Sequence, residues 1–309
     1  MEHTPILPLE IADALLWRLD GAYVDATFGR GGHSRVLLDR LADNARLLVV
    51  DRDPEAIAAA HGLAAADSRV RVAQGRFSEL QDLAREAGFE KVSGVVMDLG
   101  VSSPQLDDPD RGFSFRFDAP LDMRMDPTSG ERAADWLNAA DEAELARTFR
   151  EYGEERYAGR IARAIVARRE SHPLHRTDEL VAVIDAAQPR RDGHKHAATR
   201  VFQAIRIRIN DELEELDCGL DAAFELLEAE GRLAVLSFHS LEDRLVKRRF
   251  RRWSEGEPLP RRLPVTGERH GRARLVIKSR APDAVEIERN PRARSARLRV
   301  IEKRSRDQA

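Results

Sequence analysis

A glycine turn between two apolar segments constrains this chain more than any other feature. Residues 22–26 are mostly apolar and run into a turn that contains Gly29, Gly31 and Gly32. A second apolar segment ends at Asp51, about twenty residues beyond the turn. A strand, a glycine turn, a helix and a second strand ending on an acid are typical of a Rossmann-type site for an adenosine-containing cofactor. The sequence therefore predicts an α/β domain with such a site.

The spacing of the glycines indicates which cofactor fits. Dinucleotide sites favour the pattern G-x-G-x-x-G, but Ser34 stands where the third glycine would be. The chain also has no G-x-x-x-x-G-K-[ST] phosphate loop. A cofactor without phosphates, such as S-adenosylmethionine (SAM), therefore fits better than NAD. The glycines and Asp51 alone leave both open.

Strand and helix patterns alternate through the first third of the chain, which predicts βαβ units and a parallel sheet. The expected strands are residues 22–26, 46–51, 69–73 and 93–99, followed later by 231–238, 274–278 and 297–301. Ligands of such sheets bind at the carboxyl ends of the strands. We therefore expect the loops after these strands to converge on one cleft.

The alternation stops after the fourth expected strand, and no convincing strand follows before residue 205. Helices are expected instead at residues 133–137, 141–152, 154–170 and 177–187. The expected divisions are a first part of the α/β core at 1–107, an inserted helical substrate-recognition domain at 108–205, and a second part of the core with a basic C-terminal tail at 206–309. Residues 254–271, rich in proline and glycine, are expected to form a mobile loop.

Three helix starts carry predicted caps. Asp53 precedes Pro54, a residue favoured at the first helical position, and is expected to cap the helix after the second strand. Ser78 is expected to cap the next helix. Ser240 with Asp243 resembles a capping box at the start of a later helix.

Composition narrows the setting of the protein. Cys218 is the only cysteine, which excludes an internal disulfide and a multi-cysteine zinc site and favours a reducing cytoplasm. The chain shows neither a signal-type segment nor an apolar run long enough to span a membrane. We therefore expect a cytoplasmic protein with no membrane partner.

Charge is distributed unevenly along the chain. Residues 247–309 hold 20 Lys and Arg against 8 Asp and Glu, whereas the remaining residues hold 31 against 46. An acidic body with a strongly basic end indicates a polyanionic partner, although a solvated basic tail would look the same.

Several side chains near the expected cleft are candidates for ligand contacts. Asp51 can accept hydrogen bonds from a ribose or cap the turn at Asp53 and Pro54. Phe77 can lie against an adenine ring or belong to the core. Asp98 ends a buried strand, where an unpaired carboxylate is costly, so we expect a cofactor or substrate donor beside it. His33 and His239 follow strand ends, but histidines in such places are more often structural. No residues have the spacing of a metal site, and we predict no metal.

An aromatic and basic loop stands at the start of the expected insertion. It contains Arg111, Phe113, Phe115 and Phe117, followed by Met-Arg-Met at residues 123–125. Aromatic rings beside arginines can stack an unpaired base and hold its phosphates. The alternative is a loop folded over the core of the insertion, and the residues alone do not decide.

Together these motifs resemble the bacterial 16S ribosomal RNA (cytosine-N4)-methyltransferase family, RsmH or MraW. The resemblance runs from residue 3 nearly to the C-terminus. Its most specific blocks are residues 27–34, 51–54, 98–106, 111–115, 121–125, 152–156, 199–204, 237–244 and 290–295. Arg208 departs from the family pattern, where an apolar or neutral residue is expected, as does the proline-rich loop.

The resemblance implies a Rossmann-like class I SAM-dependent methyltransferase with a helical insertion. Its substrate would be a cytidine in the decoding region of 16S ribosomal RNA. The residues that match the family's SAM contacts are Gly31, Gly32, His33, Asp51, Phe77, Asp98 and Gln105. The expected RNA contacts are Arg111, Phe113, Phe115, Arg292 and Arg294, with Arg297 and Arg299 also in the basic tail. Nothing indicates the oligomeric state.

The chemistry of cytosine limits the mechanism. The exocyclic N4 is a poor nucleophile, because its lone pair is delocalised into the ring. We expect Asp98 or nearby carbonyls to accept the N4 hydrogens, and Phe238 or a ring of residues 113–117 to stack the base. The proton would then leave to Asp98, His239 or water. Two alternatives remain, a SAM-binding ribosome-assembly factor and a methyltransferase of small molecules.

Overall fold

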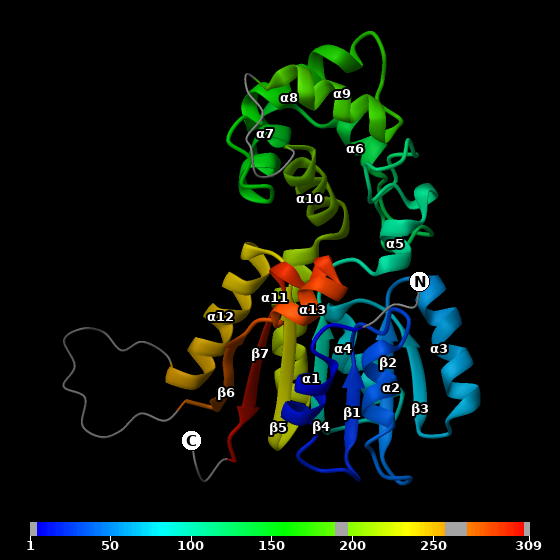
Figure 1. Ribbon diagram of the computed structural model, residues 1–309, viewed down its shortest axis with the longest axis vertical. Helices are drawn as coiled ribbons and strands as arrows, with labels where there is room; N and C mark the ends of the chain where they lie inside the picture. The colour runs from blue at the N-terminus through cyan, green and yellow to red at the C-terminus, as the bar shows by residue number, and fades with distance from the viewer. Residues whose placement is uncertain (1–4, 189–196, 257–270, 306–309) are drawn as a thin grey trace, which may run out of the picture. The chain divides into compact units, whose positions relative to one another are not determined.

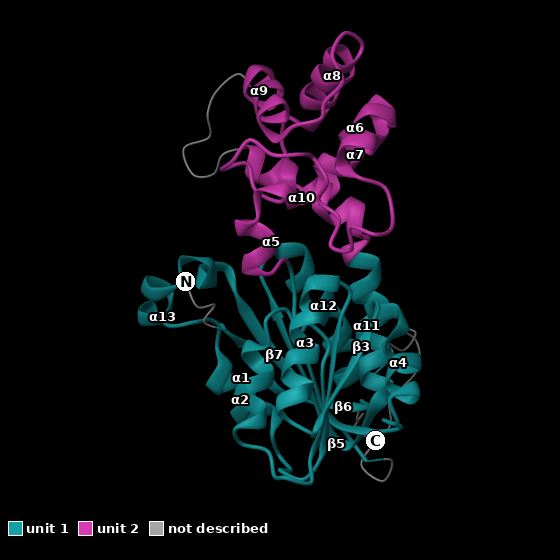
Figure 2. Cartoon of the chain, turned by 90° about the vertical axis from the view of Figure 1, so that its right-hand side faces the viewer, with its two compact units in different colours: residues 1–100, 213–309 teal, residues 101–212 magenta. Residues whose placement is uncertain are grey.

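The computed structural model describes residues 5–188, 197–256 and 271–305. The chain divides into two compact units, coloured separately in Figure 2. Unit 1 comprises residues 1–100 and 213–309, and unit 2 comprises residues 101–212.

Unit 1 is built on a sheet in which the described residues form seven strands (Figure 1). In chain order the strands are β1 (Ala22–Asp25), β2 (Arg46–Asp51), β3 (Val70–Gln74), β4 (Val92–Asp98), β5 (Leu227–Ser237), β6 (Ala273–Arg280) and β7 (Arg297–Lys303). Their order across the sheet is β3-β2-β1-β4-β5-β7-β6. The strands from β1 to β5 pair in parallel, whereas β7 is antiparallel to both of its neighbours.

The register of the strands brings chemically active residues to one edge of the sheet. Asp98 pairs with Leu236, and the next residue of β5, Ser237, pairs with Arg297. Asp51 pairs with Gln74. Because parallel strands end at the same edge, the residues after β1 to β5 all emerge there, as the sequence predicts.

Alternating side chains of the strands feed two apolar cores, one on each face. Val24 and Val95 pack on the face covered by α4 (Leu80–Glu86), α11 (Glu212–Leu226) and α12 (Ser240–Glu255). Tyr23 and Val96 pack on the opposite face, which α1 (Pro8–Leu15), α2 (Gly32–Leu38) and α3 (Pro54–Ala66) cover. This alternation has the period of two that a sheet buried on both faces requires. The short segments η1 (Phe77–Glu79), α13 (Ala284–Arg289) and η3 (Pro291–Ser295) complete unit 1.

Unit 2 is helical and has a core of its own. Its elements are α5 (Ser103–Asp107), η2 (Pro109–Arg111), α6 (Ala133–Ala139), α7 (Glu142–Glu151), α8 (Ala158–Arg169), α9 (Thr177–Ala187) and α10 (Ala197–Asn210). Large apolar side chains such as Trp136, Phe149 and Phe202 are buried in this core. The expected division of the chain after residue 205 falls inside α10.

Most of the predicted elements are confirmed, with small shifts of their ends. All seven predicted strands are present, and β5 begins earlier than expected, at Leu227. The helix predicted from residue 154 begins at Ala158, because Glu154 takes a left-handed conformation with φ of 51°. Asp53 caps α3 through the amide of Glu55, as predicted. Residues 257–270 of the expected mobile loop lie outside the described residues.

Two predicted caps are wrong. Ser78 lies within η1, and its hydroxyl donates to Glu215 instead of capping α4. Ser240 is the first residue of α12, and the capping box is formed one position earlier by His239 with Glu242. Among the described residues, no helix combines the length and the apolar character needed to cross a membrane.

Candidate functional site at the carboxyl edge of the sheet

The glycine turn after β1 depends on a residue without a side chain. Gly31 has φ of 75°, and a Cβ built there would lie 2.7 Å from the ring of Phe28. A Cβ at Gly32 would lie 3.1 Å from the side chain of Pro5. Glycine therefore allows the backbone to turn left-handed and α2 to begin directly under the N-terminal segment.

Asp51 binds the turn to the end of β2. Its carboxylate accepts hydrogen bonds from the amides of Gly29 at 2.8 Å and Asp53 at 2.9 Å, one on each oxygen. Each oxygen retains acceptor capacity, so the carboxylate can also bind the two hydroxyls of a ribose. Burial raises the pKa of Asp51 to about 6, although the two amide hydrogen bonds work in the opposite direction.

A buried carboxylate, Asp25, connects the turn to β4. It accepts hydrogen bonds from the hydroxyl of Ser34 at 2.6 Å and from the amide of Thr27 at 3.1 Å. The hydroxyl of Thr27 in turn accepts the amide of Asp98 at 2.7 Å. Burial raises the pKa of Asp25, against the effect of the Ser34 hydrogen bond. The chain of contacts fixes where the backbone of Asp98 lies.

His33 and Asp98 form the electrostatic centre of this edge. Nε2 of His33 lies 3.3 Å from Oδ2 of Asp98, and the imidazole is only 5% exposed. Burial works to lower the pKa of His33, but the Asp98 carboxylate, together with Asp25 and Glu286, outweighs it and raises that pKa. The arrangement therefore favours an imidazolium between carboxylates.

Three polar atoms of this pair are buried and lack a hydrogen-bond partner in the described part of the chain. They are Oδ1 of Asp98 and both ring nitrogens of His33, although Nε2 lies 3.3 Å from Oδ2 of Asp98 as an ion pair. Leaving such an atom unpaired costs about 1–3 kcal/mol, and native proteins contain few of them. The edge thus offers an acceptor and an imidazole nitrogen to a bound ligand.

Phe77 supplies an apolar surface at the same edge, after β3. Its side chain is half-buried and packs beside the core under α4. A Cβ at Gly219 of α11 would lie 2.5 Å from the Cβ of Phe77, so the absence of a side chain at Gly219 makes room for the side chain of Phe77. A ring with one open face can cover an adenine, and these residues together fit an adenosine-containing cofactor such as SAM.

His239 follows β5 at this edge, and the structure accounts for it through capping. Its Nδ1 accepts the amide of Glu242 at 3.4 Å, and its Nε2 lies 3.1 Å from the Glu242 carboxylate. That carboxylate also accepts the amides of Phe238 and His239 itself. The reciprocal contacts hold the start of α12, while Nε2 of His239 is buried without a hydrogen-bond partner among the described residues.

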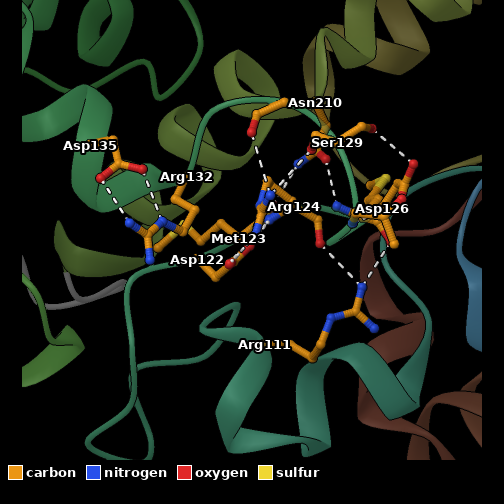
Figure 3. A network of polar contacts seen from close by, with 12 residues as sticks. Arg111, Asp122, Met123, Arg124, Asp126, Ser129, Arg132, Asp135 and Asn210 are labelled. Atoms are coloured by element: carbon orange, nitrogen blue, oxygen red, sulfur yellow. Dashed lines mark hydrogen bonds and ion pairs between the residues drawn. The ribbon is translucent and has the colours of Figure 1, made fainter.

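Two other predicted site residues lie in unit 2, where they have structural partners. Gln105 is buried, and its side-chain oxygen accepts the amide of Ser102 in the capping box of α5. Arg111 is 8% exposed and donates to the carbonyls of Arg124 at 3.1 Å and Met125 at 2.8 Å (Figure 3). Its guanidinium therefore holds the loop together from inside.

The phenylalanines of the same loop are largely enclosed. Phe113 is buried, and Phe115 packs edge-on against Phe202 with ring centroids 5.2 Å apart. Phe117 is the exception, with 50% of its surface exposed. The structure supports the alternative in which this loop folds over the core of the insertion.

The basic C-terminal tail is in large part a piece of the sheet. Arg299 on β7 is buried and forms a two-pronged ion pair with Asp243, which removes it from the expected phosphate contacts. Arg297 donates to the carbonyl of Ala296. Arg292 and Arg294 are exposed in η3, directly before β7.

Two contributors to this edge were not among the predicted residues. Thr27 lies inside the glycine motif, so its position could have drawn attention to it. Glu286 of α13 accepts the amide of Leu7 at 2.7 Å, across 279 positions of sequence, and adds negative charge near His33. No local pattern reports a pairing over that separation.

The fold and the site define a class of protein. Parallel strands with an antiparallel β7, a glycine turn without a phosphate loop and a ribose-type acid after β2 characterise a class I SAM-dependent methyltransferase.

The chain belongs to the MraW methylase family, whose model matches residues 1–304. It is 53% identical over 304 residues to the ribosomal RNA small subunit methyltransferase H of Chromohalobacter salexigens, covering 97% of this chain and 91% of that protein. It is 54% identical over 303 residues to the protein of the same name from Thiobacillus denitrificans, covering 97% of both. Among solved structures, an rRNA methylase from Streptococcus thermophilus matches with a TM-score of 0.40 and 11% identity, over 96% of this chain and 94% of that one.

Proposed function

We propose that this protein transfers the methyl group of SAM to N4 of a cytidine in the decoding region of 16S ribosomal RNA. The observation that carries the proposal is the buried, unpaired Oδ1 of Asp98 beside His33, at the edge where the cofactor fits. The names of the relatives, which are methyltransferases of small-subunit ribosomal RNA, supply the substrate class. The reaction would take place in the cytoplasm, on the small ribosomal subunit.

The residues of unit 1 that would hold SAM are those that match the family's contacts: Gly31, Gly32, His33, Asp51, Phe77 and Asp98. The remaining match, Gln105, belongs to unit 2. Bound there, the cofactor supplies an electrophilic methyl group on a sulfonium. Asp51 would bind the ribose, Phe77 would cover the adenine, and the glycine turn would let the backbone approach the ligand.

Asp98 would act on the nucleophile. By accepting a hydrogen from the N4 amino group, its carboxylate would draw that nitrogen toward a pyramidal geometry and direct the lone pair at the methyl group. His33, whose Nε2 lies 3.3 Å from Oδ2 of Asp98, holds this carboxylate in place. One N4 proton would leave to Asp98 or water as the methyl group is transferred. Orientation of the reactants supplies most of the rate in such a step.

Phe238 would hold the target base. Its ring would lie 3.8 Å from a Cβ at Gly100, so it stands beside the loop that follows Asp98. Phe238 is only half-buried, unlike Phe113. An aromatic ring at this position can stack a base that has been turned out of its neighbours' stack.

The proposal is tested with methyl-labelled SAM and small ribosomal subunits that lack the modification. After digestion of the RNA, mass spectrometry should find the label in N4-methylcytidine at one site of the decoding region. Subunits that already carry the modification are the matched control and should accept no label. SAM binding without methyl transfer would contradict the proposal and favour an assembly factor. Transfer to small acceptors with salt-independent kinetics would favour the small-molecule alternative.

A further inference from the structure

We propose that the exposed face of α12 is a track for the phosphate backbone of the substrate RNA, leading away from the reaction site. This inference rests on the proposed function and names the surface that holds its substrate. The track consists of the basic side chains on that face: Arg244, Lys247, Arg248, Arg251 and Arg252.

The pattern of burial separates this face from the one that packs on the sheet. Val246, Phe250 and Trp253 are buried under the helix, together with Glu242. At about 100° per residue, these positions share one side of α12, and the five basic residues share the opposite side. All five are exposed, and the only acid among them is Glu255.

Other cations near the helix are already used by the fold. Arg249 is bound to Asp217 at 2.5 Å and Asp221 at 2.8 Å, which attaches α12 to α11. Arg251 reaches Glu255, but this pair is exposed on both sides and such pairs contribute little. In the described part of the chain, neither Lys247 nor Arg248 has an ion-pair partner. Their charge is therefore open to an external anion.

The topology of the sheet places the track beside the site. α12 begins three residues after β5, whose Leu236 pairs with Asp98. β7 begins with Arg297 opposite Ser237, so η3 with Arg292 and Arg294 reaches the same edge. From Arg244 to Arg252 the helix rises about 12 Å, which lets successive phosphates of one strand meet it.

The chemistry of the face selects a polyanion over a lipid surface. A helix that lies on a membrane exposes apolar side chains beside its basic ones. The large apolar side chains of α12 are buried in unit 1 or half-buried, and its exposed side is charged. Phosphates spaced along an RNA strand complement a row of cations at helical spacing. Binding of this kind weakens as the salt concentration rises, because the counterions released from the RNA then gain less free energy.

The test compares two double variants that remove the same charge. Lys247→Gln/Arg248→Gln alters the track. Arg71→Gln/Arg85→Gln alters β3, the strand at the opposite edge of the sheet from β6, and the exposed side of α4. Affinity for an unmodified 16S rRNA transcript is measured over a salt series, together with SAM affinity and methyl transfer to small subunits. We expect the slope of log K against log salt, which is negative, to become shallower by about 1.4 in the first variant. The KM for subunits should rise, with SAM affinity unchanged. The second variant should leave the slope near that of the unaltered protein.

The outcomes separate this inference from the proposed function. Equal slopes for both variants would overturn the track, even if methyl transfer is normal. A change seen only with whole subunits and not with the transcript would also overturn it, because the face would then bind ribosomal protein. A reduced slope without methyl transfer by the unaltered protein would contradict the proposed function and leave the track in place. Glu255→Gln, which removes the one acid of the face, should tighten RNA binding.

Discussion

The carboxyl edge of the sheet and the loop of residues 111–125 both hold charged side chains away from solvent, but they use them differently. In the loop, Arg111 donates to two backbone carbonyls. Arg124 donates through two guanidinium nitrogens to the two carboxylate oxygens of Asp122, at 2.9 and 2.7 Å. At the sheet edge, Asp98 and His33 approach each other yet each keeps a buried atom without a partner.

This difference separates a structural network from a functional one. A buried polar group that is fully hydrogen-bonded fixes one conformation and has nothing left for a ligand. A buried polar group with an unsatisfied hydrogen bond destabilises the free protein. A ligand that supplies the missing hydrogen-bond partner recovers that free energy on binding. The loop therefore stabilises unit 2, and the sheet edge is the place to look for chemistry.

Substitution of Asp98 should have the largest effect. Asp98→Asn keeps the size of the side chain but removes the charge that faces His33 and would accept from N4. We expect kcat to fall about 100-fold or more, as for loss of a positioned acid–base group, with SAM affinity changed only a few-fold. Single-turnover methylation and calorimetric SAM binding measure the two effects.

Asp122→Asn is the matched control for that experiment, since it removes a carboxylate from the satisfied network. It should change stability by about 1 kcal/mol or less, because its pair with Arg124 is partly exposed, and leave kcat unaltered. Full turnover by Asp98→Asn with normal SAM affinity would remove Asp98 from the mechanism.

The second prediction concerns the loop. Arg111→Met retains the length of the side chain but leaves the carbonyls of Arg124 and Met125 without their donor. We expect the free energy of unfolding to fall by about 2 kcal/mol, with little change in the KM for subunits. Arg116→Met, an exposed arginine of the same loop, should affect neither quantity. A raised KM at unaltered thermal stability would instead make Arg111 an RNA contact and break the comparison.

Continuous apolar segments sufficed to predict the central strands β1, β2 and β4, because these strands are buried on both faces. The end of the insertion was harder to predict. α10 ends at Asn210 and α11 begins at Glu212, separated only by Asp211, which turns left-handed with φ of 52°. No glycine or proline stands at this boundary, so the sequence contains no helix-terminating residue from which the boundary could be predicted.

Residues of the candidate site were predictable where a polar side chain ends an apolar strand. Asp51 and Asp98 end apolar strands, and that placement alone suggests a ligand. Arg111 was misleading, since a basic residue beside phenylalanines has the same composition in a base-binding loop and in a buried one. Its orientation depends on carbonyls that only the folded loop brings together.

The third prediction uses the titration of Asp51, whose pKa is raised to about 6. The ionised carboxylate would accept the ribose hydroxyls, so SAM affinity should be about tenfold weaker at pH 5 than at pH 7.5. The stability of the free protein should change in the opposite direction. A raised pKa contributes stability at low pH, which is lost as the pH rises through about 6. Calorimetry and thermal unfolding across this range measure both, and Asp51→Asn should flatten the two profiles. If the pH profiles of Asp51→Asn run parallel to those of the unaltered protein, the titration belongs to another group.

The smallest expected effect lies at the N-terminal side of the site, where Leu7 is held in a left-handed conformation with φ of 50°. Glu286 accepts its amide, and the adjoining Pro5 packs on Gly32, so loss of this carboxylate should loosen the cover of the glycine turn. We expect Glu286→Ala to lower the free energy of unfolding by about 1 kcal/mol and to weaken SAM binding a few-fold.

Glu286→Gln retains an acceptor and should recover most of the stability. The pKa of His33, followed by NMR, should fall in this variant because a negative charge is gone. Glu288→Ala, an exposed neighbour on α13, is the control. If Glu288→Ala matches Glu286→Ala in every readout, the hydrogen bond from the Leu7 amide to Glu286 does not hold the N-terminal segment over the glycine turn. Glu286 would then not belong to the candidate site, which would be limited to residues such as Asp25, His33 and Asp98.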